Sequence, residues 1–493
     1  MRIYASFRRG VFRFAPAIAR LLLVLLLGLL AVSAGAAPTP DPLTGHYYEE
    51  ITTGKTWDQA RVDAALLVLT NQPGHLATIN NLNENLIVQH LGGTGEKWIG
   101  LTDSTATSTL DGFNLALLGT SEQGNTSGLP LPAAGVAPVI GERGSGFQWI
   151  TGEPYTFLNW RPGAPGGSAV GNDGVYVITQ GVWQDAAAGT SVGEAGGPTL
   201  RRSVVEYDVA LSQERFRVTE RLAAPTFNGN GSVPNLAEAD RLLALSDTHA
   251  DIFATATNRA YVLSFHDPDL GGGLFEFVRA PIFLNAVGVN ENDIVFRASA
   301  QVVIPQAGEW TFAVASGDPF RLNVGSNKYT GDGVLPTTPP RLTRPGLGGN
   351  LNAATGGSGE TFYFPQAGVY DLYLTTLDSG FYAFYQVFAA PGNQTNYSAA
   401  EFDLVGDVLN GGLEITCQPR VPGTLALTLE MLAGGTMRVS WNSRPCATYR
   451  LEFSETLAGW QALVGGIHPA AAFTSMDHIP GTMKGFYRLV EWD

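Results

Sequence analysis

The seven histidines and the scattered acidic residues carry most of the chain's capacity for chemistry, but they form no recognised catalytic pattern. The sequence contains neither a His-Glu-x-x-His zinc motif nor the glycine-rich loop with lysine that binds nucleotide phosphates. Residues 189–193, Gly-Thr-Ser-Val-Gly, match the pattern around a nucleophilic serine, which requires a preceding strand and a following helix. Neither flanks this glycine-rich segment. We therefore predict a protein without catalytic activity.

A pair of carboxylates on a turn is a second candidate for chemistry. Asp267 and Asp269 flank Pro268 and precede three glycines. Two acids at this spacing can share a hard cation such as calcium, which takes oxygen ligands. Two solvated turn residues would give the same pattern, and this second interpretation is the one we favour.

The composition limits the classes of fold and partner. Of the 493 residues, 15% are charged and 44% hydrophobic, which excludes a disordered, charge-rich chain. The 60 glycines and 29 prolines favour a β-protein with many turns. The formal net charge of −15 disfavours nucleic acid as a partner, because neutralising phosphates needs a basic surface.

The beginning of the chain has the pattern of a secretory signal peptide. Residues 1–36 contain five arginines, a run of 12 apolar residues at 21–32 and the small residues Ala34-Gly35-Ala36. A membrane anchor is the alternative, although 12 residues are few for a span. Removal of the segment leaves 24 basic and 44 acidic residues, a formal charge of −20. We expect a secreted or cell-surface protein whose mature chain has no transmembrane span.

Helices are expected only near the beginning of the mature chain. Thr56 can cap a helix that starts at Trp57, and a second helix is predicted over residues 81–91. Beyond Trp98 the pattern indicates strands. Residues 303–312 and 363–372 both contain Pro-Gln-Ala-Gly and then an aromatic residue, which predicts two equivalent hairpin corners in one sandwich.

The last part of the chain alternates apolar and polar residues with the period of β-strands. Leu425, Leu427 and Leu429 begin this pattern, and it indicates a small sandwich of the immunoglobulin or fibronectin type. The chain's two cysteines, Cys417 and Cys446, both fall here. In an exported protein they can form a disulfide; two buried free thiols are the alternative.

A series of motifs runs from Tyr47 to Tyr207. In chain order they are Tyr47-Tyr48, Gly74-His75-Leu76-Ala77-Thr78-Ile79, Asn83-Glu84-Asn85, Trp98-Ile99-Gly100-Leu101, Phe147-Gln148-Trp149, Gly152-Glu153-Pro154, Asn159-Trp160, Gly181-Val182-Trp183-Gln184-Asp185 and Val204-Val205-Glu206-Tyr207. Together they resemble a C-type lectin-like domain, which implies an α+β fold for residues 45–208. Many members carry two disulfides, and this segment has no cysteine. Its stability is then expected to depend on burying five tryptophans: Trp57, Trp98, Trp149, Trp160 and Trp183.

The same resemblance suggests where a ligand would bind. In sugar-binding members, a Glu-Pro-Asn-type triplet and a Trp-Asn-Asp triplet hold a calcium ion that binds sugar hydroxyls. Here these positions are Ala164-Pro165-Gly166, which lacks both side-chain ligands, and Trp183-Gln184-Asp185. Calcium needs six to eight oxygens. The candidate ligand-binding residues are Gln184, Asp185, Asn172, Asp173 and Tyr176, and the candidate metal ligands are Asp185 and Glu206.

Two other interpretations of these residues stay open. Gln184 and Asp185 would serve a structural role if they hydrogen-bond loop backbone, and we favour this interpretation over calcium binding. Without calcium, a ligand would instead contact exposed aromatic and amide groups, for which Tyr155, Tyr176 and Gln184 are the candidates.

Two further resemblances complete the domain organisation. The segments 263–267, 296–298, 304–312 and 316–324 are similar to a protective-antigen-type β-sandwich, found in adhesins and in secreted glycosidases. The family's Ser-Asp-Asp-Gly is here Ser316-Gly317-Asp318-Pro319, so Asp318 is predicted to be a turn residue. The last part is similar to fibronectin-like modules. We predict a mainly β multi-domain protein: signal peptide 1–36, C-type lectin-like domain 45–208, β-sandwich 216–392 and C-terminal sandwich 411–493.

The predicted function is binding without catalysis. The first hypothesis is a secreted, adhesion-type protein that binds a glycan or another cell-surface ligand, with calcium as the candidate cofactor. The alternative is a structural or protein-interaction component of an envelope or matrix whose lectin sites are degenerate. The family resemblances favour a bacterial source.

Overall fold

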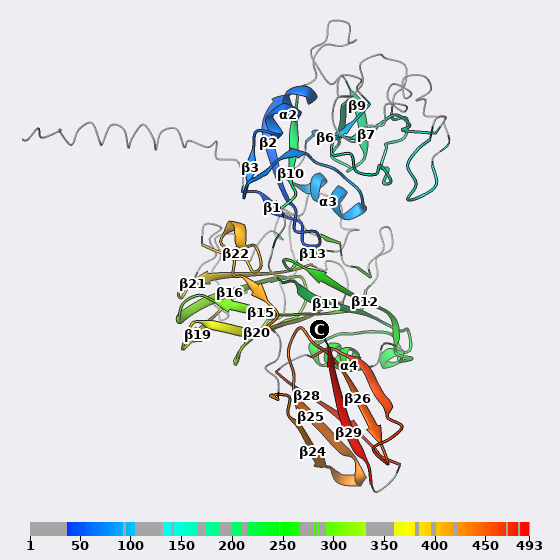
Figure 1. Ribbon diagram of the computed structural model, residues 1–493, viewed down its shortest axis with the longest axis vertical. Helices are drawn as coiled ribbons and strands as arrows, with labels where there is room; N and C mark the ends of the chain where they lie inside the picture. Colours follow the sequence, from blue (N-terminus) through cyan, green and yellow to red (C-terminus); the bar gives the residue numbers. More distant parts are fainter. Residues whose placement is uncertain are drawn as a thin grey trace, which may run out of the picture. The chain divides into compact units, whose positions relative to one another are not determined.

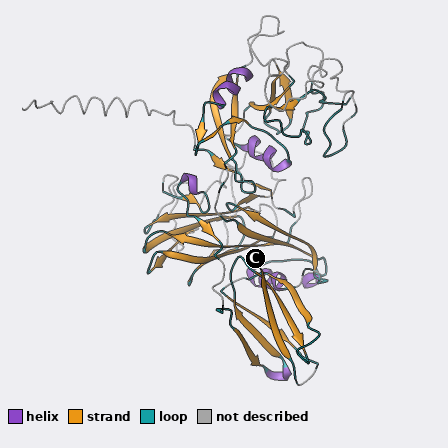
Figure 2. Cartoon of the chain, in the orientation of Figure 1, coloured by secondary structure: helices purple, strands orange, loops and turns teal. Residues whose placement is uncertain are grey.

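The computed structural model describes residues 37–91, 95–103, 130, 132–139, 142–165, 174–186, 200–209, 211, 214–245, 247, 249–266, 280–281, 283–284, 292–331, 359–379, 384–395, 401–418, 423–469, 472–481 and 484–492. The predicted signal peptide, segment 189–193, Asn172, Asp173 and the Asp267/Asp269 pair lie outside these residues. The described chain is mostly strand (Figure 2), as predicted. None of its helices is long and apolar enough to cross a membrane.

The first part of the chain folds around one sheet with the strand order β1-β2-β10-β6-β8-β9 (Figure 1). The strands are β1 (Thr39–Pro40), β2 (Tyr47–Lys55), β6 (Lys97–Thr102), β8 (Gly174–Val177), β9 (Trp183–Ala186) and β10 (Arg201–Tyr207). Two short strands pair with the central strands of this sheet: β5 (His75–Leu76) pairs with β10, and β7 (Gln148–Trp149) pairs with β6. A separate pair is formed by β3 (Val68–Leu69) and β4 (Gln72–Pro73). Because β2 and β10 pair directly, the two ends of this domain are held together.

The two predicted helices of this domain are confirmed. In α2 (Trp57–Ala64), the Thr56 side chain accepts from the Gln59 backbone N–H while the Gln59 side chain accepts from the Thr56 N–H. Asn81 caps α3 (Leu82–His90) by accepting from the Glu84 backbone N–H. Both caps satisfy amides that a helix start otherwise leaves without partners.

All five tryptophans predicted to form the core of this domain are buried. Two of their indole N–H groups donate to backbone carbonyls: Trp57 donates to Ile99, and Trp98 donates to Lys55. Trp183 donates to Asn85 Oδ1 at 2.7 Å, which ties β9 to α3. The aromatic core thus joins helix, loop and sheet.

The middle part is a sandwich of two sheets. Sheet I has the order β12-β11-β15-β20-β17-β18, with β23 also paired to β15. Its strands are β11 (Phe216–Ala223), β12 (Ile252–Ala260), β15 (Ile294–Ile304), β17 (Phe320–Val324), β18 (Asn327–Gly331), β20 (Gly368–Asp378) and β23 (Ile415–Thr416). Sheet II has the order β14-β13-β21-β16-β19, with β22 paired to β21. Its strands are β13 (Ser264–His266), β14 (Ala280–Pro281), β16 (Gly308–Ser316), β19 (Gly359–Phe364), β21 (Phe384–Pro391) and β22 (Asp403–Leu404).

The two Pro-Gln-Ala-Gly corners are equivalent, but they are not hairpins. Each carries the chain from one sheet to the other, from β15 to β16 and from β19 to β20. Ile304 pairs with Gly368 while Gly308 pairs with Phe364, so the corners lie side by side. Their aromatic residues also make matching hydrogen bonds, from Trp310 Nε1 to the Gln306 carbonyl and from the Tyr370 hydroxyl to the Gln366 carbonyl. The predicted equivalence is confirmed, whereas the hairpin geometry was wrong.

A helix in the middle part was missed by the sequence pattern. The helix α4 (Leu236–Ala244) is capped by Asn235, whose side chain accepts from the Ala237 and Glu238 backbone N–H groups. Its buried residues Ala239, Leu242 and Leu243 pack with Val295 and Leu377 of sheet I. The expectation of strands alone beyond Trp98 was therefore wrong: Asn235 is a helix cap, and the apolar face that follows it packs on sheet I.

The last part is a small sandwich of two three-stranded sheets, β24-β25-β28 and β27-β26-β29. The first contains β24 (Leu427–Met431), β25 (Met437–Asn442) and β28 (Phe473–His478), and the second contains β26 (Thr448–Ser454), β27 (Gln461–Ile467) and β29 (Phe486–Trp492). Trp441, Ala447 and Tyr449 are buried between them. A short 3-10 turn, η6 (Ala433–Gly435), lies between β24 and β25; two others, η3 (Phe227–Gly229) and η5 (Val408–Asn410), lie in the middle part.

The boundary before this last part differs from the expectation. Residues 411–493 were predicted to form one domain, but β23 pairs with β15 of the middle sandwich. The middle sandwich likewise extends beyond residue 392, because β22 pairs with β21. A disulfide joins Cys417, just after β23, to Cys446, just before β26. The covalent link therefore connects the end of the middle sandwich to the last one.

Candidate ligand-binding site

The predicted ligand position lies at the outer strand β9 of the first sheet. Gln184 is partly exposed there, and its Oε1 accepts a hydrogen bond from Arg161 Nη1 at 2.6 Å. Two backbone hydrogen bonds fix the segment that carries Arg161: Trp183 N–H donates to the Asn159 carbonyl and Arg161 N–H donates to the Trp183 carbonyl. The Ala164–Pro165 peptide bond that follows is cis. An amide and a guanidinium are thus held together at the surface.

The aromatic candidates for this site were wrong. Tyr155 is buried and accepts a hydrogen bond from Trp160 Nε1 at 2.7 Å. Tyr176 is also buried, with the Arg201 guanidinium 3.6 Å from its ring centroid and the Trp98 ring at 5.7 Å. Every residue of β8 is buried, so both faces of this strand are covered and Tyr176 does not reach solvent. Neither ring presents a face to a ligand.

The proposed pairing of Asp185 with Glu206 in one metal site was also wrong. Asp185 is buried on β9, while Glu206 is on β10. The strands β8 and β6 lie between β9 and β10 in the sheet. Three strand spacings of about 4.8 Å place the two backbones roughly 14 Å apart. One cation cannot span that distance, since carboxylate ligands lie within about 2.6 Å of it.

Glu206 instead belongs to a polar cluster at the other side of the sheet. Its Oε1 accepts from the Tyr48 hydroxyl at 2.8 Å and lies 2.8 Å from His46 Nδ1, and its Oε2 accepts from the Thr78 N–H at 2.8 Å. Asp208 lies 3.4 Å from His46 Nδ1 and 3.3 Å from His75 Nε2. No sequence spacing predicts this cluster; it forms because β10 pairs with both β2 and β5, which places His75 directly opposite Glu206.

The cluster is better described as a hydrogen-bonded network than as a calcium site. Among the described residues, His46, Glu206 and Asp208 are the group whose ligand atoms lie close enough for one ion, within 4.8 Å of one another. An imidazole nitrogen suits zinc rather than calcium. Both oxygens of Glu206 already have hydrogen-bond partners, so the buried carboxylate is satisfied without a metal.

Charge attraction in this network shifts the histidine pKa values upward. Burial opposes the charged form of His75, but its hydrogen bond to Asp208 and the nearby charge of Glu206 raise the His75 pKa to about 9. The pKa of His46 is raised too, because its hydrogen bond to Glu206 and the surrounding acids outweigh burial. The hydrogen bond from His75 in turn lowers the pKa of Asp208. At neutral pH the cluster therefore holds an ionised Asp208 against a protonated His75.

This arrangement predicts a stability that falls at alkaline pH. The folded-state pKa of His75 lies above its unfolded value of about 6.5, so its contribution is complete below pH 6.5 and is lost as the pH rises through 9. We expect a loss of about 2 kcal/mol, reduced by screening because Asp208 is half exposed. Urea unfolding of the first domain at pH 6 and pH 10 measures it. The His75→Gln variant should lack this part of the pH dependence. If its unfolding free energies at pH 6 and pH 10 differ as much as those of the wild type, the assignment to His75 is contradicted.

Comparison with known proteins gives partial likenesses only. No family model and no curated protein matches the chain. The cow C-type carbohydrate-recognition domain of CD23, solved in the presence of an oligosaccharide, is 20% identical over 34% of this chain and 90% of its own, with a TM-score of 0.22. The Epithelial Adhesin 9 A domain from Candida glabrata, in complex with Galb1-4GlcNAc, is 10% identical over 39% of this chain and 91% of its own, with a TM-score of 0.23. The PA14 domain of the antifreeze protein MpAFP is 16% identical over 38% of this chain and 90% of its own, with a TM-score of 0.24.

These similarities point to C-type lectin and adhesin domains, each over part of the chain. Because the TM-scores are all below 0.5, they do not identify a family.

Proposed function

We propose that the protein is exported and binds a glycan or another cell-surface or matrix ligand without catalysing a reaction. The observation that supports this most directly is the Arg161–Gln184 pair, which lies at the surface where the sequence resemblance puts ligand binding. A guanidinium offers only donors and an amide offers both donors and acceptors. This combination suits sugar hydroxyls and other polar ligands.

The residues at the expected calcium position also favour binding without calcium. Two of the expected ligand positions, Ala164 and Gly166, have no side-chain oxygen, and Asp185 is buried. Calcium remains the candidate cofactor only if residues 172 and 173 contribute, and these lie outside the described part of the chain. We propose that direct hydrogen bonds from Arg161 and Gln184 carry the binding.

The second candidate function is a structural or protein-interaction role in an envelope or matrix. The burial of Tyr155, Tyr176 and Asp185 favours it, because it leaves few groups with which the lectin-like domain could hold a sugar. The two candidates differ in whether a glycan binds at all.

A glycan array tests the proposal. The mature chain should bind at least one glycan, and chelation should leave the signal unchanged. The double variant Arg161→Ala/Gln184→Ala should reduce the signal about tenfold or more, because two hydrogen-bonding groups are lost. Arg438→Ala is the control, since it removes a surface arginine of the last sandwich that pairs with Asp477 and lies away from β9.

Three outcomes separate the alternatives. No glycan signal with or without calcium would contradict glycan binding and favour the structural role. Loss of signal on chelation, reproduced by Asp185→Ala, would support a calcium site. A melting temperature that does not respond to chelator would argue against tight calcium binding, because a bound ion stabilises the folded state.

A further inference from the structure

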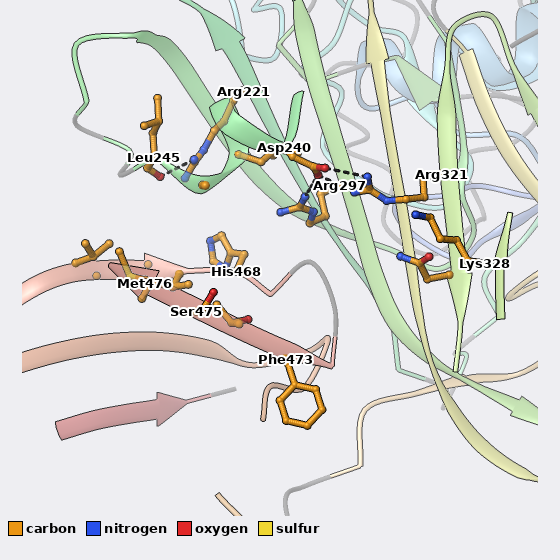
Figure 3. Close-up of a pocket in the computed structure, with 18 residues that line it drawn as sticks. Arg221, Asp240, Leu245, Arg297, Arg321, Lys328, His468, Phe473, Ser475 and Met476 are labelled. Atoms are coloured by element: carbon orange, nitrogen blue, oxygen red, sulfur yellow. Dashed lines mark hydrogen bonds and ion pairs between the residues drawn. The ribbon is translucent and has the colours of Figure 1, made fainter. Parts of the chain in front are cut away.

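A pocket rich in arginine lies where sheet I and α4 face the last sandwich (Figure 3). Its volume is about 380 Å³. Four basic residues on four strands line it: Arg221 on β11, Arg297 on β15, Arg321 on β17 and Lys328 on β18. We call this the arginine pocket. Across it lie His468, just after β27, and residues 473–476 of β28.

The register of sheet I explains why the arginines meet. Arg297 is directly opposite Thr375 of β20, and Thr375 is directly opposite Arg321. Residues directly opposite one another in a sheet project from the same face. Thr219 is opposite Arg297 on β11, and Arg221 is two residues further along the same face. The small side chains of threonine leave the space between the arginines open.

The pocket has an excess of positive charge. Among its lining residues Asp240 of α4 is the single acid, and it accepts from Arg321 at 2.7 and 2.8 Å and from Arg297 at 3.0 Å. Arg221 is balanced in part by Asp247, which does not line the pocket. Burial and the neighbouring arginines lower the pKa of His468 to about 3, so it is neutral in the pocket. This cationic site occurs in a chain whose formal charge is −15.

Several donors in the pocket have no acceptor. Arg221 and Arg297 are 2% and 5% exposed, and the Nε atom of each is buried without a hydrogen-bond partner. His468 Nδ1, a donor or an acceptor depending on the tautomer, is also buried without a hydrogen-bond partner. Figure 3 shows Arg297, Arg321 and His468 directed toward the same space. A buried donor without a partner destabilises the folded protein, so this lining is suited to a ligand that brings acceptors and negative charge.

We propose that the arginine pocket binds the carboxylate of an acidic sugar such as a hexuronic acid; as a second glycan site, this rests on the proposed function. A carboxylate matches the planar fork of arginine, as Asp240 already does with Arg321. The volume is in the range of small-ligand pockets. Phe473, which is 75% exposed at the rim, offers an apolar face to the sugar ring, while Asn323 and Ser475 can bind its hydroxyls.

Calorimetric titration of the mature chain with glucuronate tests the site. Glucuronate should bind, glucose should not, and affinity should fall as salt is raised because the attraction is electrostatic. Lys328→Gln should weaken binding about tenfold, since an exposed cation at the pocket is lost while the buried ion pairs stay intact. Asp240→Asn should strengthen binding, because it removes the carboxylate that competes for Arg321. Arg438→Gln, outside the pocket, is the control.

Each result decides the proposal. Equal affinity for acetate and glucuronate would overturn recognition of the sugar, and unchanged affinity in both Lys328→Gln and Asp240→Asn would overturn the pocket as the site. Because Asp240→Asn removes partly buried ion pairs, the far-ultraviolet circular dichroism of this variant must match that of the wild type. If the two spectra differ, Lys328→Gln alone decides the test. Glucuronate binding that survives Arg161→Ala/Gln184→Ala would support a separate site. If glucuronate binds but the glycan array shows no other signal, the function proposed for β9 is contradicted and the arginine pocket is still supported. If the array shows a signal but glucuronate does not bind, only the proposal for the arginine pocket is overturned.

Discussion

Replacing Trp183 by alanine should destabilise the first domain by about 4 kcal/mol, the usual cost of removing a buried large aromatic side chain. Trp183 is fully buried, and its ring lies within about 6 Å of four other aromatic rings: Trp149, Tyr155, Phe157 and Trp160. Its indole N–H also donates to Asn85 Oδ1. The substitution leaves a cavity and an unpaired amide oxygen on α3.

Urea unfolding followed by circular dichroism measures this effect without depending on tryptophan fluorescence. The transition of the first domain should shift to lower urea, while those of the two sandwiches should not move. Leu66→Ala is the matched control in the same domain, because Leu66 is 74% exposed and its loss should cost less than 0.5 kcal/mol. A loss below 1 kcal/mol for Trp183→Ala would show that the aromatic cluster does not hold the domain together.

Reducing the disulfide should cost about 3 to 4 kcal/mol of unfolding free energy. Cys417 and Cys446 are 29 residues apart in sequence, and closing a loop of this length restricts the unfolded chain by that amount in the chain-entropy description. Because Cys417 follows β23 and Cys446 precedes β26, the last sandwich should be the part that unfolds earlier.

Urea unfolding with and without dithiothreitol tests this second effect. The Cys417→Ser/Cys446→Ser variant should behave like the reduced wild type, and reductant should have no effect on it. Equal midpoints for oxidised and reduced wild type would contradict the prediction. Trp183→Ala and reduction should have additive effects, since distant independent sites usually do.

Local patterns predicted the elements of the fold better than they predicted the site. Thr56 marked the first helix because a cap is read within four residues of sequence. The second helix was also predicted, although Asn81, expected inside it, is its cap. The tryptophans were correctly placed in the core because burying a large aromatic ring is favourable wherever the sheet allows it. The same tendency explains the error at Tyr155 and Tyr176, which were expected to be exposed and are also buried.

The cluster around Glu206 and the arginine pocket could not be predicted because both depend on strand register. His46 and His75 meet Glu206 and Asp208 only because β10 pairs with β2 on one side and β5 on the other. Arg297 and Arg321 are neighbours only through β20, which comes later in the chain than either of them. A one-residue change in any of these registers would point the side chains to opposite faces.

The late position of β22 and β23 in the chain delays completion of the middle sandwich during synthesis. β13 covers β21 only over Phe384 to Gln386, and β22 pairs with Phe388 and Ala389 beyond it. Likewise, β11 pairs with β15 only as far as Ser299, and β23 pairs with Gln301 and Val302 beyond it. Until residue 404 has been added, this part of β21 stays unpaired in sheet II, and until residue 416 this part of β15 stays unpaired in sheet I. Unpaired strand edges are templates for association between chains. At about 5–20 residues per second, the interval after residue 392 lasts roughly one to five seconds. A chain released at that earlier point would carry both edges permanently.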